Sequence, residues 1–265
     1  MSINLMDASA LMQARVVPES MENRTVINEV CVDSRKAGPG CLFFCIPGAR
    51  FDGHDFADNA AVAGALAIVS QRELPALPLR PDGSQTPVLV VEDTCKALGA
   101  LARGYRARTK AKVVGITGTA GKTTVKECLS QVLSKAGSTA KNYLNLNNQI
   151  GLPLSMLAAS ENDAFWVMEA GISKPHDMDE LGEIMRPDLG IVLNVGPGHT
   201  AGLGDLGVAH YKSLFLTHLA AGGIGLVNAD YPELVRNARK LCSNLIMFSG
   251  KGRDATYRGG YIGGV

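Results

Sequence analysis

The sequence lacks the features that mark secreted, zinc-binding or membrane proteins. Its six cysteines stand singly, without a C-x-x-C pair, and its five histidines form no H-E-x-x-H motif. Scattered cysteines of this kind are typical of buried, reduced thiols. No apolar run reaches the roughly 18 residues that span a bilayer, and the first residues have no apolar signal-peptide core. We therefore expect a cytoplasmic protein without a membrane span.

An excess of charge of either sign is also missing. The 26 basic and 25 acidic residues leave a formal net charge of +1, so we expect no nucleic-acid partner. Hydrophobic residues make up 46% of the chain and charged residues 19%, which is typical of a globular protein with a substantial core. The 265 residues are enough for two ordinary domains or one large one.

The most informative stretch is K-V-V-G-I-T-G-T-A-G-K-T-T-V-K-E, residues 112–127. An apolar run predicts a buried strand, a glycine-rich turn follows, and a helix begins near Lys122. This order is typical of a phosphate-binding loop, whose N–H groups and helix N-terminus attract a phosphate. Ile116 replaces the first glycine of the standard G-x-x-x-x-G-K-[ST] motif, so this loop is a compact variant. The residues expected to bind the nucleotide are Thr117, Gly118, Thr119, Ala120, Gly121, Lys122, Thr123 and Thr124.

Residues 1–108 predict a small α/β domain. Residues 71–87 contain four prolines and no periodicity, which indicates an exposed loop. Asp93 and Thr94 begin a helix that ends in basic residues, as the helix dipole favours. The expected strands are 26–32, 41–46, 65–69 and 88–91, and the expected helices are 55–63 and 93–108.

From residue 109 to residue 265 strands and helices alternate, which predicts a parallel sheet covered on both faces. The fold class is therefore α/β, a small α/β domain followed by a parallel-sheet domain with a phosphate loop. Ligands of such sheets bind at the carboxyl ends of the strands. The expected strands are 113–116, 165–168, 189–195, 225–228, 245–248 and an edge strand within 255–265. The expected helices are 122–136, 150–159, 178–185, 205–220 and one between the last two long strands.

The phosphate loop, Glu169 and His199 each follow a strand and can converge on one crevice, and the helix expected at 205–220 carries Lys212. Mg²⁺ prefers oxygen ligands and bridges phosphate oxygens, so Thr123 and Glu169 are natural ligands beside a nucleotide. His199 is a less typical magnesium ligand and is equally well a loop histidine. Lys212, considered alone, is a helical lysine of the kind that is usually solvated. From the residues alone we predict an enzyme that uses ATP or GTP, with no indication of its substrate.

Several motifs occur together in the order of one family. They are T-G-T-A-G-K-T-T-V-K-E at 117–127, E-A-G-I-S at 169–173, N-V-G-P-G-H at 194–199 and H-Y-K-S at 210–213. In this order they resemble the phosphate loop, the two magnesium motifs and the carbamylated lysine of the Mur ligases of peptidoglycan synthesis.

The resemblance extends to the N-terminal domain. D-S-R at 33–35, P-G-C-L-F at 39–43 and G-A-R-F-D-G-H-D-F at 48–56 resemble the UDP-sugar-binding domain shared by the third and fourth amino-acid-adding ligases of the family. N-L-N-N-Q-I-G-L-P at 145–153, together with E-A-G, favours the fourth-step ligases over the third-step ones.

The resemblance implies a reaction and its residues. ATP would phosphorylate the terminal carboxylate of UDP-MurNAc-tripeptide, and the amine of D-alanyl-D-alanine would then attack the acyl phosphate. The domain at 1–108 would bind UDP-MurNAc and the domain at 109–265 would bind ATP, in a protein that we expect to be a monomer. The implied catalytic residues are Lys122, His199 and Lys212, and the implied Mg²⁺ ligands are Thr123, Glu169, His199 and a carbamylated Lys212. The implied substrate contacts are Ser34, Arg35, Asp52, Gly53 and His54 for the UDP-sugar, and Asn145 and Asn148 for the muramoyl-peptide end.

Two departures from the family pattern matter. Leu214 stands where the family often has an acidic residue. A full ligase of the family continues beyond the position of Val265, so we expect a truncated chain that folds and binds ligands but does not ligate alone. Three alternatives stay open at this point: a third-step ligase, a folylpolyglutamate-synthase-type ligase, and a non-catalytic UDP-sugar or nucleotide-binding module.

Overall fold

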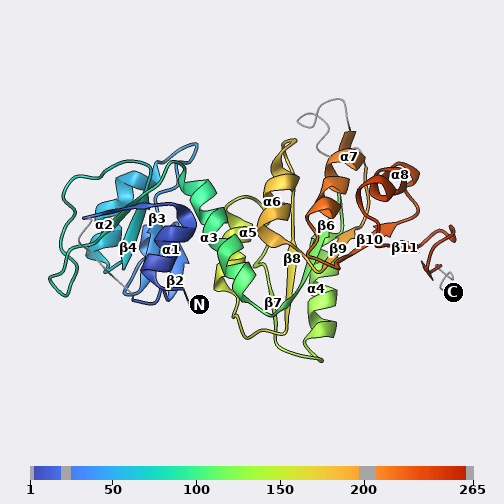
Figure 1. Cartoon of the computed structure of the whole chain (residues 1–265), viewed down its shortest axis with the longest axis horizontal. Coiled ribbons are helices and arrows are strands. Elements are labelled where there is room, and N and C mark those ends of the chain that lie inside the picture. Colours follow the sequence, from blue (N-terminus) through green and yellow to red (C-terminus); the bar gives the residue numbers. More distant parts are fainter. Residues whose placement is uncertain (1–2, 19–24, 197–206, 261–265) are drawn as a thin grey trace. The chain divides into compact units, whose positions relative to one another are not determined.

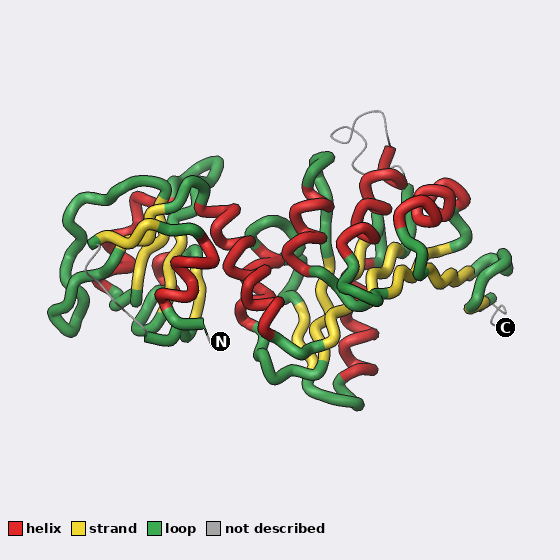
Figure 2. Tube along the Cα trace, viewed as in Figure 1, coloured by secondary structure: helices red, strands yellow, loops and turns green. Residues whose placement is uncertain are grey.

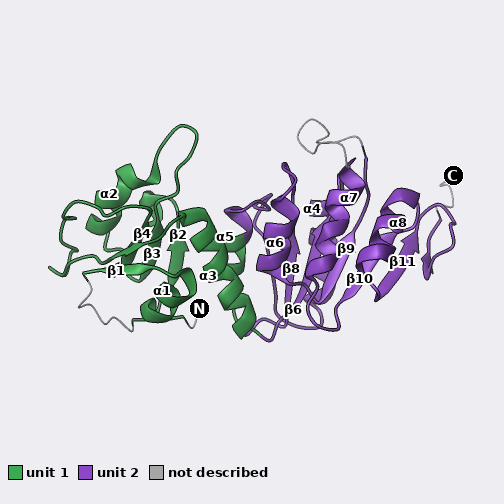
Figure 3. Cartoon of the chain, turned by 45° about the horizontal axis from the view of Figure 1, so that its top comes forward, with its two compact units in different colours: residues 1–109, 153–161 green, residues 110–152, 162–265 purple. Residues whose placement is uncertain are grey.

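The computed structural model of the chain describes residues 3–18, 25–196 and 207–260. These residues form two compact units, residues 1–109 with 153–161, and residues 110–152 with 162–265 (Figure 3). Each unit has a β-sheet of its own, and each is described separately below. In the described ranges no helix is long and apolar enough to cross a bilayer.

The first unit is built around a five-stranded sheet (Figure 1). Its strand order is β1-β5-β4-β3-β2, with β1 antiparallel to β5 and the other neighbours parallel. The neighbouring strands β3 and β4 are buried along their whole length, as their continuous apolar sequences predict. The elements are α1 (Leu5–Met12), β1 (Arg15–Val17), β2 (Glu29–Cys31), β3 (Cys41–Phe44), α2 (Ala57–Val62), β4 (Ala67–Ser70), β5 (Val88–Val90) and α3 (Thr94–Arg108).

Short capped turns connect these elements. Two 3₁₀ turns, Ser34–Lys36 and Gly53–Phe56, are capped by the side chains of Asp33 and Asp52. Helix α3 begins where the Asp93 carboxylate accepts the N–H groups of Cys95 and Lys96. In place of the helix expected at 55–63, the structure has the 3₁₀ turn Gly53–Phe56 followed by the shorter α2. Helix α1 and strand β1 were not predicted. Strand β1 has only three residues and pairs with a distant strand, Val17 with Val88 and Arg15 with Val90, 71 and 75 positions apart.

The second unit is a seven-stranded sheet in which all neighbouring strands are parallel. The strand order is β12-β11-β10-β9-β6-β8-β7, so the chain starts in the middle at β6, builds one side and then crosses to the other. The elements are β6 (Lys112–Thr117), α4 (Lys122–Leu133), β7 (Thr139–Lys141), α5 (Gly151–Ala158), β8 (Phe165–Glu169), α6 (Asp177–Met185), β9 (Leu189–Val192), α7 (Gly207–Leu214), β10 (Ile224–Asn228), α8 (Pro232–Leu241), β11 (Leu245–Ser249) and β12 (Tyr257–Arg258). Residues 153–158 of α5 belong to the first unit, where the Tyr105 hydroxyl donates to the Ala159 carbonyl at 2.8 Å.

Helices cover both faces of this sheet (Figure 2). On one face Val125, Leu129 and Leu133 of α4 pack on a cluster that includes Ile116 and Val167. On the other face helix α6, helix α8 and the 3₁₀ turn Phe215–His218 cover the strands. Gly115 of β6 allows this close approach, because a Cβ there would lie 2.4 Å from Phe215 and 2.6 Å from Met185.

The sequence placed most elements correctly but not all of their ends. The helix expected at 122–136 ends at Leu133, and the helix expected at 205–220 is α7 followed by a 3₁₀ turn. The strand expected at 189–195 ends at Val192, and the edge strand within 255–265 has only two residues among those described. The edge strand β7 was missed because its sequence, T-A-K, has no apolar alternation.

Candidate active site

The phosphate loop lies between β6 and α4, at the carboxyl edge of the central strand. Gly121 is the N-cap of α4, has a φ of +82° and makes no side-chain cap hydrogen bond. A left-handed conformation of this kind favours glycine. The first N–H groups of a helix have no intrahelical partners, so those of α4 point at the space beyond its N-terminus. The loop therefore offers backbone donors and a helix dipole to an anion.

Asn194, just beyond β9, fixes the shape of this loop. Its side chain bonds both backbone groups of Ala120: it accepts the N–H and donates to the carbonyl, each at 2.9 Å. Its own carbonyl accepts the Thr119 N–H at 3.2 Å, and the Thr119 hydroxyl accepts the Gly196 N–H at 3.1 Å. In the sequence Asn194 stands out only as the first residue of the motif N-V-G-P-G-H. Its role as a support of the loop is decided by the neighbouring positions of β6 and β9.

Two side chains of the loop have polar atoms suited to a ligand. Lys122 donates from Nζ to the Gly118 carbonyl at 3.0 Å, so its ammonium lies over the loop. The Thr117 hydroxyl is buried and finds no hydrogen-bond partner among the described residues. A buried polar atom without a partner costs free energy, on the order of 1–3 kcal/mol.

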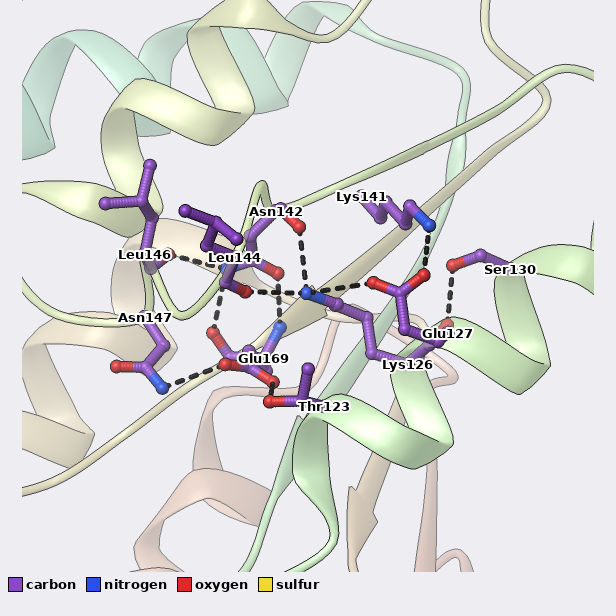
Figure 4. A network of polar contacts seen from close by, with 10 residues as sticks. All are labelled: Thr123, Lys126, Glu127, Ser130, Lys141, Asn142, Leu144, Leu146, Asn147 and Glu169. Atoms are coloured by element: carbon purple, nitrogen blue, oxygen red, sulfur yellow. Dashed lines mark hydrogen bonds and ion pairs between the residues drawn. The ribbon is translucent and has the colours of Figure 1, made fainter.

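Glu169 meets the phosphate-loop helix directly. It is the last residue of β8 and is fully buried. The Thr123 hydroxyl donates to its Oε2 at 3.0 Å, and the Asn147 amide donates to its Oε1 at 2.9 Å (Figure 4). Thr123 and Glu169 are 46 positions apart in sequence, and the parallel pairing of β6 with β8 brings them together.

The Asn142 side chain bonds the backbone of Glu169 at the end of β8. Its Oδ1 accepts the Glu169 N–H at 2.8 Å, and its Nδ2 donates to the carbonyls of Glu169 and Leu146 at 3.1 and 2.7 Å. The side chain is fully buried. Sequence reasoning named Asn145 and Asn148 in this region and missed Asn142 and Asn147. The Asn-rich composition was visible, but only the fold shows which of these amides face Glu169.

Asn145 and Asn148 are both exposed. The Asn148 Oδ1 accepts the N–H groups of Ile150 and Gly151 at 3.2 and 2.8 Å, and so it caps the start of α5. Their predicted contact with the muramoyl-peptide end stays a prediction.

Lys212 lies on α7, is almost fully buried and has no hydrogen-bond or ion-pair partner among the described residues. Burial, with repulsion from Lys122 as a smaller cause, lowers the pKa of the Lys212 ammonium to about 8. His199, the other predicted residue of this region, lies outside the described residues.

The donor atoms present fit a magnesium ion. A threonine hydroxyl and a buried carboxylate oxygen stand 3.0 Å apart beside the phosphate loop, and Mg²⁺ takes few protein oxygens when a nucleotide supplies the others. In the described part of the chain no three His, Cys, Asp and Glu side chains come together as a metal cluster. The two oxygens of Thr123 and Glu169 therefore suit a metal that arrives with phosphates.

The residues predicted to bind the UDP-sugar lie on two turns of the first unit. Arg35 is mostly exposed, and its guanidinium pairs with the Asp33 carboxylate at 2.7 Å. Hydrogen bonds from the Arg35 side chain and backbone lower the pKa of Asp33 to about 2. Ser34 is half-buried and begins the 3₁₀ turn that Asp33 caps.

The second turn is more tightly built. The Asp52 Oδ1 accepts the His54 N–H at 3.0 Å and also lies 2.5 Å from His54 Nδ1. The Gln71 N–H donates to His54 Nε2 at 3.0 Å, which makes Nδ1 the protonated nitrogen of a neutral ring. A Cβ at Gly53 would lie 2.5 Å from the Ile46 nitrogen, so only glycine fits there. Both ring nitrogens of His54 are thus used within the protein.

Comparison with known proteins agrees with this geometry. The family model described as "Mur ligase middle domain" matches residues 116–262, and the model described as "Mur ligase family, catalytic domain" matches residues 26–106. The chain therefore belongs to the Mur ligase family.

Within this family the chain is similar to UDP-N-acetylmuramoyl-tripeptide–D-alanyl-D-alanine ligases. It is 39% identical to that ligase of Escherichia coli (strain K12) over 205 residues, which cover 77% of this chain and 44% of the relative. The structure of MurF from Acinetobacter baumannii superposes with a TM-score of 0.84 at 28% identity, over 94% of this chain and 54% of that one. MurF ligase from Thermotoga maritima in complex with ADP gives a TM-score of 0.73 at 31% identity, over 85% of this chain and 51% of that one. The chain spans about half the length of the curated relatives that it matches.

Proposed function

We propose that this chain carries the UDP-sugar-binding and ATP-binding parts of an ATP-dependent ligase that adds D-alanyl-D-alanine to UDP-MurNAc-tripeptide. The observation that carries the proposal is the contact of Thr123 with Glu169 beside the phosphate loop. It joins the helix that receives a nucleotide to a buried carboxylate from the neighbouring strand. The names of the relatives given above support UDP-MurNAc-tripeptide as the carboxylate substrate and D-alanyl-D-alanine as the amine substrate.

The reaction must turn a carboxylate, which is a poor electrophile, into a reactive acyl group. Transfer of the γ-phosphoryl of ATP to the terminal carboxylate of the tripeptide gives an acyl phosphate, and the D-alanyl-D-alanine amine displaces phosphate to form the amide. The protein's contribution to such a transfer is positioning and charge stabilisation. The N–H groups of residues 121–124 and the Lys122 ammonium would hold the phosphates and neutralise the charge on the migrating group, because the Thr119 and Ala120 N–H groups already donate to Asn194.

Thr123 and Glu169 are the residues that would hold Mg²⁺. When bound, the metal supplies positive charge to the phosphate oxygens. Glu169 is suited to this because Asn142 and Asn147 already fix its backbone and one of its oxygens. His199 completes this proposed set.

Lys212 is proposed to act as a carbamate. Carbamylation requires a neutral amine, and the burial that lowers the Lys212 pKa to about 8 leaves roughly one amine in ten neutral at pH 7. The modification replaces a buried cation by an anion and removes the repulsion from Lys122. Both changes suit a site that binds a metal.

In the first unit, Ser34, Arg35 and the 52–54 turn are proposed to contact the UDP-sugar. The exposed Arg35 guanidinium offers donors to a diphosphate. The Asp52–His54 pair keeps the second turn in shape. We propose a cytoplasmic location, which the six free cysteines support, and a monomer, which sedimentation would test.

Calorimetry on the purified chain tests the binding half of the proposal. ATP with Mg²⁺ is expected to bind, and Lys122→Ala is expected to abolish this binding because the ammonium contacts the phosphates. UDP-MurNAc-tripeptide is expected to bind the wild-type chain and the Lys122→Ala variant equally. Failure of the wild-type chain to bind either ligand would contradict the proposal.

An acceptor panel tests the catalytic half. Because the chain spans about half of its relatives, turnover is measured in a hybrid in which these residues replace the matching part of the E. coli ligase. We expect release of ADP that depends on D-alanyl-D-alanine and is lost with Lys122→Ala. ADP release that depends on a single amino acid would favour a third-step or folylpolyglutamate-type ligase.

A non-catalytic binding module is the remaining alternative. Such a module gives no reason for a carbamate, so the chain is incubated with ¹³C-bicarbonate, Mg²⁺ and ADP and observed by NMR. A carbamate signal that is absent from Lys212→Met supports the ligase. No such signal in the wild-type chain supports the module.

A further inference from the structure

Lys126 is a buried cation that the proposed reaction does not use. It lies on α4 one turn after Thr123, and none of its surface is exposed. Its Nζ donates to the carbonyls of Asn142 and Leu144 at 2.9 and 2.8 Å, and it lies 3.4 Å from Glu127 Oε1 (Figure 4). Two of the three N–H donors of this ammonium thus have carbonyl acceptors, and the Glu127 carboxylate forms an ion pair with it. Two carbonyls and one carboxylate therefore compensate the burial of this charge.

The segment that Lys126 holds is the turn 142–147, which links β7 to α5. Apolar burial does little to fix the middle of this turn, because Tyr143 is 72% exposed and Leu144 is 62% exposed. Leu144 also has a φ of +50°, a conformation that costs a non-glycine residue roughly 1 kcal/mol or more. Polar bonds must therefore hold the turn in place, and those from Lys126 reach two of its six residues.

The same turn carries the amides that hold Glu169. Asn142 bonds the backbone of Glu169, and Asn147 donates to its Oε1 at 2.9 Å. The Asn147 carbonyl also accepts the Gly171 N–H at 2.9 Å. Contacts thus run without a break from the Lys126 ammonium, through the turn, to one oxygen of the buried carboxylate. The other oxygen accepts the Thr123 hydroxyl.

We propose that Lys126 is a positioning residue for the Glu169 carboxylate. By fixing the turn 142–147 it keeps Asn147 on Oε1 and so directs Oε2, with Thr123, toward the Mg²⁺ that accompanies the nucleotide. The inference rests on the proposed function, because it assigns a role within the same magnesium and nucleotide site. Lys126 and Thr123 lie three residues apart on the same side of α4. One helix therefore positions both Thr123, a proposed Mg²⁺ ligand, and Lys126, which positions the second ligand Glu169.

The test measures how Mg²⁺ improves ADP binding to the full chain. Calorimetric titrations over a range of Mg²⁺ concentrations give the concentration for half of the maximal gain in ADP affinity. Lys126→Met keeps the apolar stem and removes the donors, and it is expected to raise this concentration about 10-fold, the usual size for loss of a residue that orients a metal ligand. ADP affinity without Mg²⁺ is expected to stay within about 2-fold, since Lys122 and the loop are untouched.

Lys141→Met is the matched control. Lys141 pairs with the same Glu127 carboxylate from the protein surface, and its side chain makes no hydrogen bond to the turn among the described residues. The Mg²⁺ dependence of ADP binding to the Lys141→Met variant should therefore equal that of the wild type. Lys126→Arg keeps donors near the carbonyls and should recover part of the loss. A Lys126→Met protein with the Mg²⁺ dependence of Lys141→Met would overturn the inference.

A double-mutant cycle with Asn147→Ala separates positioning from general damage. If Lys126 acts through Asn147, each single variant raises the required Mg²⁺ about 10-fold and the double variant is no more than about 2-fold worse than either. Effects that multiply would show that Lys126 acts elsewhere, and they would overturn the inference. If Lys126→Met does not fold, Lys126→Gln takes its place in the same cycle.

The outcome also distinguishes this inference from the proposed function. A wild-type chain whose ADP binding is independent of Mg²⁺ contradicts the proposed function itself. A wild-type chain that depends on Mg²⁺, with Lys126 variants that depend on it equally, contradicts only the role of Lys126.

Discussion

At the scale of single residues, the site contains three buried ionisable side chains, Glu169, Lys126 and Lys212, which differ in their partners. Glu169 is a buried carboxylate whose two oxygens both accept hydrogen bonds. Lys126 is a buried ammonium with two carbonyl acceptors and an ion-pair partner, whereas Lys212 has no partner among the described residues. Burial penalises an unpaired charge more than a paired one. In Lys212 nothing among the described residues offsets this penalty, and its pKa falls to about 8.

The Asp33–Arg35 turn gives a prediction about pH. Hydrogen bonds from Arg35 lower the pKa of Asp33 to about 2 from its ordinary value of 3.8. A lowered carboxylate pKa stabilises the folded chain above about pH 3.8, and this stabilisation is lost as the pH falls through about 2. We expect an NMR titration of the Asp33 carboxyl to have its midpoint near 2.

Arg35→Ala should move this midpoint up toward 3.8, because the largest contribution to the shift comes from the Arg35 side chain. Arg50→Ala, on the loop before the 3₁₀ turn Gly53–Phe56, serves as the control and should leave the midpoint unchanged, because Arg50 is not among the causes of the Asp33 shift. A midpoint near 3.8 in the wild-type chain would contradict the prediction.

At the scale of elements, the site is assembled from three strand ends. Strand β6 leads into the phosphate loop, β8 ends at Glu169, and β9 leads into Asn194, which bonds Ala120 of the loop. These strands lie next to one another in the order β9-β6-β8. The chain order reverses around β6, and such a reversal leaves a crevice at the carboxyl ends of the strands.

Gly115 sets how closely helices approach this sheet. A methyl group there would meet Phe215 and Met185 at 2.4 and 2.6 Å, so Gly115→Ala is expected to destabilise the chain by roughly 1–3 kcal/mol through overpacking. Urea denaturation would measure this change. Gly259→Ala is the control, because nothing lies within 4 Å of a Cβ there. Equal stability of the two variants would show that the packing adjusts without cost.

Element prediction from the sequence succeeded where the signal was local. The apolar runs at 113–116 and 165–168 and the Asp93 cap mark elements that the structure contains as β6, β8 and α3. It failed at β1 and β7, which are short edge strands held by pairing with distant partners. Pairing of this kind depends on tertiary context more than on the composition of the strand.

At the scale of the whole molecule, each compact unit has its own sheet and core. The first unit recruits residues 153–161 from a later part of the chain, through contacts such as Tyr105 with Ala159. It is therefore not a continuous stretch of sequence. The second unit holds the phosphate loop, Glu169 and Lys212 together.

The single tryptophan makes the second unit observable by itself. Trp166 lies fully buried in β8, three positions before Glu169. A ligand that binds only the folded state stabilises it by about 2.7 kcal/mol at 100 times its dissociation constant. We therefore expect Mg²⁺ with ATP to raise the thermal midpoint seen by tryptophan fluorescence by about 5–10 °C. Lys122→Ala should remove the increase, and a midpoint unchanged by ATP in the wild-type chain would contradict nucleotide binding to this unit.

The sequence alone determined the α/β class, the order of the main elements and the phosphate loop, because these depend on periodicity and on neighbouring residues. It also supplied the candidates Lys122, Thr123, Glu169 and Lys212. Only the tertiary structure decided which side chains support them. Asn194 contacts a residue 74 positions away, and Thr123 contacts one 46 positions away. Lys126 was indistinguishable from a solvated helical lysine until the turn 142–147 was seen to cover it, because burial is a property of the folded chain.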